Sequence, residues 1–235
     1  MGAHNVKALG VISVVIPARD EAATVAGMVD VCRRAAGEVV VVDDCSSDDT
    51  AAVALAAGAR VVRGPGRGKG AAMRAGLAAS TGNIVVFADA DVTSLGPRFV
   101  TALAQPLIDR DEVVFVKGRY ERAGAGGRVN ELVARPLLER LFPALAFVEQ
   151  PLGGEYAGRR AVLEALSFEG GYGVDVGLLL DIAARHGVGA IAQVDLGVRV
   201  HRNRPLSELR GPAHEVVDVI LDRAGVAAPE QRRPA

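Results

Sequence analysis

Short runs of β-branched residues alternate with helical stretches over the first half of the chain, and this alternation constrains the fold most strongly. The predicted strands cover residues 11–16, 38–42, 60–62, 84–87 and 112–116. The predicted helices between them cover residues 22–36, 50–57, 71–80 and 97–108. Such alternation is typical of a mostly parallel sheet with helices on both faces. The sequence therefore predicts an α/β fold.

The second half of the chain departs from this alternation. Helices are predicted over residues 128–141, 175–186 and 214–224, with strand-like runs at 190–194 and 198–200 and an irregular stretch at 151–156. A length of 235 residues suits one large α/β domain. We therefore predict a single domain over residues 1–235, with a first half at 11–118, a second half at 119–225 and a disordered tail at 226–235.

Charge and cysteine content exclude several classes of protein. The formal net charge is −1, so no overall field would attract nucleic acid or an acidic membrane. Cys32 and Cys45 lack metal-ligand spacing and are expected to be reduced. The sequence shows neither a signal peptide nor an apolar stretch of membrane-spanning length. We therefore expect a cytoplasmic protein that binds neither nucleic acid nor a membrane.

Two carboxylates, Asp89 and Asp91, follow the predicted strand at 84–87. Residues two apart in an extended segment point to the same side, so both carboxylates would face one edge of the sheet. Hard oxygen ligands there can hold a divalent cation, which in turn can hold a diphosphate. The alternative is that both residues begin a loop and cap the next helix. Polar residues also follow two other strands, at 17–21 and 43–48, and parallel strands end at one edge, which favours a ligand site.

Lys69 lies in a glycine-rich stretch, residues 64–70, that is predicted to be a mobile loop. A P-loop would need glycine at position 63 and serine or threonine at position 70, and the chain has Arg63 and Gly70 there. The P-loop interpretation therefore fails. Lys69 is either a cation near a phosphate or base at the same edge, or a solvated loop residue, and the loop alone does not separate these alternatives.

His201 follows the last strand-like run and stands among Arg199, Arg202 and Arg204. A single histidine is most often a structural or surface residue, but neutral imidazole is also a common metal ligand. The crowding of four basic or imidazole groups favours a functional role. We therefore predict that His201 completes the metal coordination begun by Asp91.

Several motifs together resemble a known family of glycosyltransferases. The motifs at residues 14–21, 40–48, 68–70 and 89–91 resemble GT-A glycosyltransferases of the family 2-like group. Those at 127–136, 150–156, 171–175 and 192–205 resemble the glucosyl-3-phosphoglycerate synthases, a retaining GT-A family (family 81). The resemblance implies a Rossmann-like GT-A domain whose 11–118 half binds a nucleotide sugar and whose 119–225 half binds an acceptor. It also implies a metal-dependent enzyme that moves glucose from a nucleoside-diphosphate glucose, such as UDP-glucose, to 3-phosphoglycerate with retention of configuration.

The same resemblance implies roles for individual positions. It implies that the nucleotide sugar contacts Pro17, Ala18, Glu21, Ser46, Lys69, Asp89, Leu152 and Tyr172. The acceptor would contact Gly127, Arg128, Asn130 and Asn203, while Asp91 and His201 would hold Mg²⁺ or Mn²⁺. The residues implied in the reaction itself are Asp175, Asp91 and Arg199. A bound divalent metal would stabilise the negative charge of the leaving diphosphate.

Two positions depart from the family pattern. Asp175 stands where the family has glutamate, and the shorter side chain reaches roughly 1.5 Å less far, which leaves glucose and mannose both open as the transferred sugar. Asn130 stands where the family has threonine, which leaves another acceptor open. A catalytically silent nucleotide-sugar-binding protein is the alternative from a different class, and the joint presence of the acidic pair, Lys69 and His201 speaks against it. The resemblance also allows a homodimer.

Overall fold

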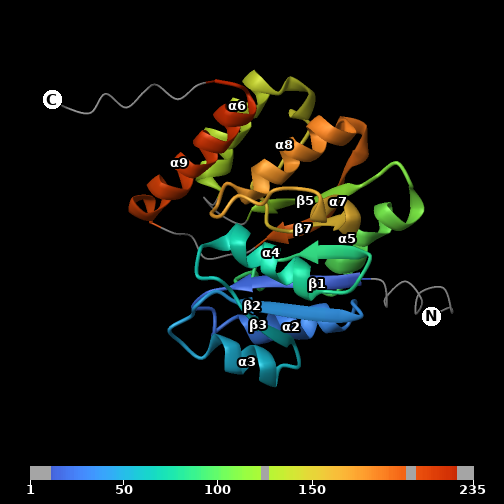
Figure 1. The fold of residues 1–235 in the computed structure, drawn as a ribbon, viewed down its shortest axis with the longest axis vertical. Coiled ribbons are helices and arrows are strands. Elements are labelled where there is room, and N and C mark those ends of the chain that lie inside the picture. Colours follow the sequence, from blue (N-terminus) through green and yellow to red (C-terminus); the bar gives the residue numbers. More distant parts are fainter. Residues whose placement is uncertain (1–11, 123–126, 200–204, 227–235) are drawn as a thin grey trace.

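The computed structural model describes residues 12–122, 127–199 and 205–226, and its centre is one seven-stranded sheet. The strands are β1 (Ile12–Ala18), β2 (Glu38–Asp43), β3 (Arg60–Arg63), β4 (Ile84–Phe87), β5 (Phe115–Arg122), β6 (Tyr156–Arg159) and β7 (Ile191–Arg199). Their order across the sheet is β3-β2-β1-β4-β6-β5-β7 (Figure 1). β6 is antiparallel to β4 and to β5, and the other strand pairs are parallel. The prediction of a mostly parallel sheet is confirmed.

Helices cover both faces of this sheet, as the alternation of strands and helices predicts. They are α2 (Val25–Arg33), α3 (Thr50–Ala56), α4 (Lys69–Ala79), α5 (Arg98–Asp109), α6 (Arg135–Leu141), α7 (Arg160–Glu164), α8 (Val174–His186) and α9 (Leu206–Arg223). Short helical turns are η1 (Asn130–Ala134), η2 (Pro143–Leu145) and η3 (Val188–Ala190). In Figure 1, α6, α8 and α9 lie together at the top of the molecule.

Successive residues of each central strand enter two different hydrophobic cores, because strand side chains alternate between the faces. Val14 and Ile16 of β1 pack in the core that includes side chains of α2, α3 and α5. Val15 packs in the core on the opposite face, with side chains of α4, α6, α7, α8 and α9. Burial on both faces explains why these strands read as unbroken apolar runs in the sequence.

Several predicted strand boundaries are wrong for reasons that lie in the tertiary structure. The strand predicted at 112–116 begins at Phe115 and continues through polar residues to Arg122, because β7 pairs with it along its length. The runs at 190–194 and 198–200 form the single strand β7. β6 was not predicted, since its four residues include a small pair, Ala157 and Gly158, without apolar alternation. The central sheet takes strands from both predicted halves, and β5 crosses the boundary between them.

Helix boundaries differ most at two places that matter for the site. α4 begins at Lys69, two residues earlier than predicted, and α9 begins at Leu206, eight residues earlier. Gly211 and Pro212 disfavour a helix locally, yet both lie inside α9. The predicted helix at 128–141 contains a π-helical turn, η1, before α6. Tertiary packing therefore outweighs local propensity in α9.

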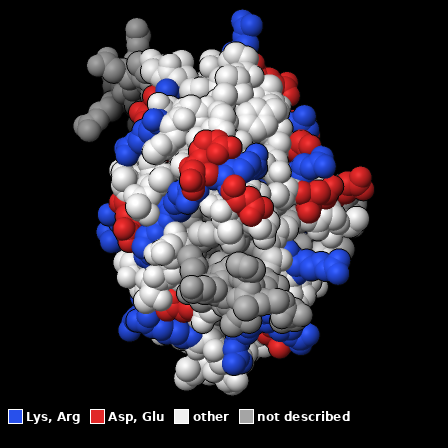
Figure 2. Space-filling model, turned by 90° about the vertical axis from the view of Figure 1, so that its right-hand side faces the viewer, with Lys and Arg blue, Asp and Glu red and all other residues white. Residues whose placement is uncertain are grey.

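The distribution of charged side chains on the surface is consistent with the near-zero net charge. Figure 2 shows acidic and basic side chains interspersed on one face, separated by uncharged residues, without a patch of one sign. Within the described residues, every helix is too short or too polar to cross a lipid bilayer.

Candidate active site

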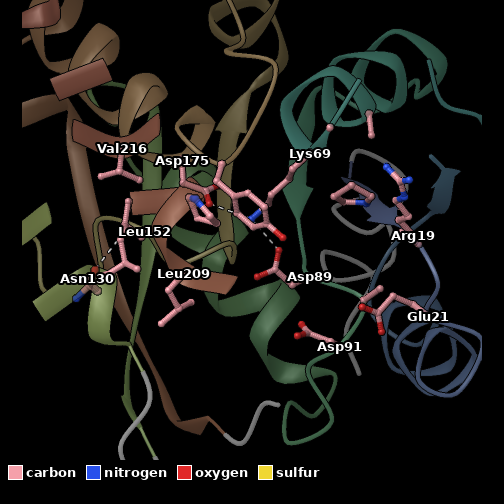
Figure 3. Close-up of a pocket in the computed structure, with 18 of the residues that line it drawn as sticks. Arg19, Glu21, Lys69, Asp89, Asp91, Asn130, Leu152, Asp175, Leu209 and Val216 are labelled. Carbon is pink, nitrogen blue, oxygen red and sulfur yellow. Dashed lines mark hydrogen bonds and ion pairs between the residues drawn. The ribbon is translucent and has the colours of Figure 1, made fainter. Parts of the chain in front are cut away.

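A cavity of about 400 Å³ opens at the carboxyl ends of β1 and β4, where open α/β sheets bind ligands (Figure 3). Apart from Ser46, every predicted site residue in the described part of the chain lines this cavity. Its wall consists of Pro17, Ala18, Arg19, Glu21, Asp44, Gly68, Lys69, Ala72, Asp89, Ala90, Asp91, Gly127, Arg128, Val129, Asn130, Leu152, Tyr172, Asp175, Arg199, Leu209, Pro212 and Val216. His201 and Asn203 lie outside the described residues. Both predicted halves therefore contribute to one cavity.

Lys69 joins two carboxylates at the centre of the cavity (Figure 3). Its Nζ lies 2.9 Å from Asp89 Oδ1 and 2.9 Å from Asp175 Oδ2. Burial alone would lower the pKa of Lys69, but the two carboxylates outweigh burial and hold that pKa well above its usual range. The Tyr156 hydroxyl donates a 3.0 Å hydrogen bond to Asp175 Oδ1. Lys69 is therefore a permanent cation that cross-links the two carboxylates.

The backbone around Lys69 is held by specific contacts. Gly68 has a φ of +94°, a conformation that favours glycine, and α4 begins at the next residue. The amides of Gly66 and Gly68 donate hydrogen bonds of 2.7 and 3.1 Å to the buried Asp44 carboxylate. The Lys69 side chain is only 16% exposed. The prediction that Lys69 lies in a mobile loop is wrong, and so is the alternative of a solvated lysine, because α4 and Asp44 fix its position.

Arg199 is the second buried cation of the cavity and is 5% exposed. Its Nη2 lies 2.9 Å from Asp89 Oδ2, and its Nη1 lies 3.0 Å from Glu155 Oε2. Nη1 also donates a 2.6 Å hydrogen bond to the Tyr120 hydroxyl. Burial alone would raise the pKa of Asp89, but Lys69 and Arg199 hold that pKa far below its usual range. Asp89 is therefore an anion held by two cations.

Asp91 differs from Asp89 in having no side-chain partner within the described residues. Burial, followed by the negative charge of Asp89, raises the pKa of Asp91 above its usual range. A half-buried carboxylate without a cation is a favourable ligand for a divalent metal, which would supply the missing positive charge. No cluster of three or more metal-ligating side chains occurs among the residues described here, so Asp91 would need ligands from elsewhere.

One end of the cavity is lined by residues that follow β1. Pro17 and Ala18 end the strand, and Glu21 lies beyond a turn held by side chains from the loop after β2. The Glu21 amide donates a 2.8 Å hydrogen bond to Thr50 Oγ1. Ser46 does not line the cavity, and its Oγ accepts a 3.0 Å hydrogen bond from the Asp20 amide. Ser46 therefore stabilises the turn after β1 without facing the cavity.

The other end of the cavity is lined by the start of the helical segment before α6, by Leu152 and by α9. Asn130 is 2% exposed, and its Nδ2 donates to Glu131 Oε1 at 2.9 Å and to Glu149 O at 3.3 Å. Its Oδ1 accepts a 3.3 Å hydrogen bond from the Leu152 amide. Asn130 thus holds Leu152 in the cavity wall. Arg128 brings a positive charge to the same end.

Three buried polar residues behind the cavity were not identified from the sequence. Glu155 is completely buried, and burial raises its pKa to about 7. Lys117 is also completely buried; burial lowers its pKa to about 8, and its Nζ donates to Pro151 O and Gly153 O at 3.2 and 2.6 Å. Tyr156 contacts Asp175 as described. A charged residue inside an apolar strand run, as at Lys117, is the signal that could have indicated such a role.

The sequence matches the protein-family model of glycosyl transferase family 2 over residues 13–166. The chain is 46% identical to the glucosyl-3-phosphoglycerate synthase of Mycolicibacterium smegmatis, over 94% of this chain and 80% of that protein. 

Solved structures give the same result for the fold. A crystal structure of glucosyl-3-phosphoglycerate synthase from Mycobacterium tuberculosis, in complex with Mn²⁺, UDP-glucose and phosphoglyceric acid, is 46% identical and has a TM-score of 0.89. A second crystal structure of that enzyme, with Mg²⁺ and UDP, has a TM-score of 0.88. Both matches cover 94% of this chain and 82% of the matched chain. The fold described above therefore recurs in the glucosyl-3-phosphoglycerate synthase of Mycobacterium tuberculosis.

Proposed function

This chain belongs to the glucosyl-3-phosphoglycerate synthase family of glycosyltransferases, and we propose that the cavity of Figure 3 is where it transfers glucose from a nucleoside-diphosphate glucose to 3-phosphoglycerate. One observation carries the assignment of the site. The network of Lys69, Asp89 and Asp175 lines the same cavity as Arg128 and the segment before α6. A donor and an anionic acceptor can therefore meet in one cavity.

The enzyme uses Mg²⁺ or Mn²⁺, and the residues present fit such an ion. Asp91 offers a carboxylate without an ion pair in the described residues, two residues from the carboxylate of Asp89, which suits a hard divalent cation. We assign Asp91 as one ligand and His201 as a second, the latter on the family resemblance. When bound, the metal stabilises the negative charge of the departing diphosphate as a Lewis acid.

The protein's own residues hold the donor end in place. Pro17, Ala18 and Glu21 are assigned to the nucleoside, because they line the end of the cavity beyond β1. Lys69 brings a fixed positive charge close to Asp89, where the diphosphate of the donor is expected. Preorganised charge of this kind stabilises a transition state more than mobile charge does, because it needs no reorganisation during the reaction.

Asp175 is assigned to the sugar. Lys69 and the Tyr156 hydroxyl each bind one of its oxygens, at 2.9 and 3.0 Å, so the carboxylate is fixed at the cavity wall. A carboxylate held in this way orients a sugar hydroxyl by accepting its hydrogen bond. Leu152 and Tyr172 form the neighbouring wall.

The transfer itself breaks one bond and forms another at the same carbon of the sugar. The bond from the anomeric carbon to the phosphate oxygen breaks, and its electron pair leaves with the diphosphate. The acceptor hydroxyl oxygen bonds to that carbon on the same face, and its proton passes to the departing phosphate oxygen. A double displacement would instead need a carboxylate nucleophile against the sugar. Asp175 is bound by Lys69 and Tyr156, which favours the direct route.

The acceptor is assigned to the end of the cavity lined by Gly127, Arg128 and Asn130. The guanidinium of Arg128 can bind a phosphate or carboxylate with two parallel hydrogen bonds. Asn130 contributes to this end by fixing Leu152, whose backbone amide donates a hydrogen bond to Asn130 Oδ1. Asn203 is assigned to the acceptor on the family resemblance.

A turnover screen tests this function. UDP-glucose, GDP-glucose and GDP-mannose are each incubated with 3-phosphoglycerate and Mg²⁺, and the products are separated by anion-exchange chromatography. We expect product from a glucose donor. Product from GDP-mannose alone would refute glucose transfer and identify Asp175 as the residue to examine for sugar choice. Failure of all three donors to give product, while a donor still binds in a metal-dependent way, would refute 3-phosphoglycerate as the acceptor.

We propose that the enzyme acts in the cytoplasm on water-soluble substrates, without nucleic acid or a membrane as partner. We also propose a homodimer, on the family resemblance. Light scattering coupled to size-exclusion chromatography tests it, and a monomer mass would refute it.

A further inference from the structure

Glu155 is a buried carboxylate beside the cavity to which the transfer reaction assigns no role. It is 0% exposed and lies directly before β6. Its neighbour Gly154 packs against Asp89, since a Cβ at Gly154 would lie 2.3 Å from both carboxylate oxygens of Asp89. Its other neighbour, Tyr156, binds Asp175. The segment that carries Glu155 therefore contacts both carboxylates that Lys69 links.

The partner of Glu155 is Arg199, and stability does not explain the pair. Glu155 Oε2 lies 3.0 Å from Arg199 Nη1, yet neither Glu155 oxygen receives a well-aligned hydrogen bond from the described residues. Arg199 Nε also has no well-aligned partner among them. Removing two charges from water costs several kcal/mol per ion, and buried pairs are often replaced by apolar residues without loss of stability. A role in the position of Arg199 accounts for the pair better.

The contacts of Arg199 decide which carboxylate is left free. Nη1 is held by Glu155 and Tyr120, and Nη2 by Asp89. Lys69 is occupied by Asp89 and by Asp175. The two cations are thus taken up by Asp89, Asp175 and Glu155, and Asp91 has no ion pair within the described residues. Arg199 and Asp91 nevertheless line the same cavity, and Arg199 already pairs with Asp89, which lies two residues before Asp91.

We propose that Glu155 is a positioning residue that holds Arg199 away from Asp91 and so keeps the Asp91 carboxylate open for a divalent cation. The proposal rests on the proposed function in one respect, the assignment of the metal to Asp91. A neutral side chain at position 155 removes the charged partner of Nη1 and leaves only the Tyr120 hydroxyl to hold it, so that Arg199 can turn toward Asp91. Its positive charge would compete with the metal for the same carboxylate.

Glu155→Gln tests this proposal, because the amide keeps the shape of the side chain and removes its charge. Binding of Mn²⁺ is measured by electron paramagnetic resonance in the presence of UDP, with no acceptor and no turnover. We expect the Kd for Mn²⁺ to rise about 10- to 100-fold, the usual effect of losing a residue that orients the metal's surroundings. In the transfer assay, saturating Mn²⁺ should restore most of kcat, which general damage to the site would not allow.

The matched control is Glu164→Gln. Glu164 also pairs with an arginine, its Oε1 lying 3.2 Å from Arg160 Nη1, but this pair lies outside the cavity. Its Kd for Mn²⁺ should equal that of the unmodified enzyme. An unchanged Kd in a folded Glu155→Gln protein would overturn the proposal.

Tyr120→Phe decides the question if Glu155→Gln does not fold. This change removes the hydroxyl that accepts the 2.6 Å hydrogen bond from Arg199 Nη1 and leaves the charges in place. A weaker rise in Kd supports the proposal, and an unchanged Kd refutes it. Because binding of Mn²⁺ and UDP is measured without acceptor, a failure of the proposed transfer to 3-phosphoglycerate would show separately, in the unmodified enzyme.

Discussion

Replacing Lys69 by methionine removes the cation between Asp89 and Asp175 while keeping a side chain of similar length. Lys69 Nζ lies 2.9 Å from an oxygen of each carboxylate, so these two oxygens are at most twice that distance apart. Two unit charges about 6 Å apart repel by roughly 3 kcal/mol at an effective dielectric constant of about 20. Removing one partner of a buried pair typically costs about 3–5 kcal/mol. We therefore expect Lys69→Met to lower the free energy of unfolding by about 3 kcal/mol near neutral pH.

The loss of stability in Lys69→Met should depend on pH. Lys69 and Arg199 hold the pKa of Asp89 below its unfolded value, so this carboxylate stabilises the native state above that value and loses its effect as the pH falls. Without Lys69 the pKa of Asp89 rises, and its protonation relieves the repulsion. The difference in stability between Lys69→Met and the unmodified protein should therefore shrink as the pH falls below about 4.

Urea unfolding followed by circular dichroism at several pH values measures both quantities. Arg34→Met is the control, because it removes a cation from an exposed ion pair with Asp30 whose side chains are 63% and 60% exposed. Such surface pairs contribute about 1 kcal/mol or less. A loss at Lys69 as small as that at Arg34, or one that does not depend on pH, would refute the view that Lys69 balances buried charge.

Three further predictions follow from the same cavity. Asp91→Ala should abolish transfer while leaving the unfolding curve nearly unchanged, and turnover in this variant with metal present would refute the metal assignment. Gly154→Ala should cost about 1–3 kcal/mol of stability, because its Cβ would lie 2.3 Å from the oxygens of Asp89, which two cations hold in place. Gly96→Ala is the control, since a Cβ there would have no neighbour within 4 Å, and it should be neutral in the same urea assay. Burial raises the pKa of Glu155 to about 7, so the free energy of unfolding should fall by up to roughly 3 kcal/mol as the pH rises from about 4 to about 7. Glu155→Gln should flatten this part of the pH profile. An unchanged slope would contradict the raised pKa of Glu155.

The parts of the fold that local pattern determines could be predicted from the sequence. β1, β2 and β4 are apolar runs buried on both faces, and their covering helices follow the expected period, so these elements were found close to their observed positions. β6 and the start of α9 could not be found in this way. β6 consists of four residues that are strand only because β4 and β5 lie on either side, and α9 runs through Pro212 because its other residues pack on α8.

In the site, too, the sequence predicts the residues in local motifs but not those whose position depends on tertiary contacts. Asp89, Asp91 and Asp175 lie in motifs that can be read along the chain, and the structure brings them into one cavity. The Lys69 prediction failed in its detail, because the contacts that hold its backbone come from Asp44, far away in sequence. Glu155 could not be assigned, since its role depends on contact with a residue in β7.

Glucose transfer to 3-phosphoglycerate in this cavity can be observed by following the reaction by proton NMR. The unmodified enzyme is mixed with UDP-glucose, 3-phosphoglycerate and Mg²⁺, and the anomeric proton of the product is observed during turnover. We predict a new glucosyl signal with the α configuration of the donor, growing as 3-phosphoglycerate is consumed. Release of free glucose and UDP without loss of 3-phosphoglycerate, or a β-linked product, would contradict the account.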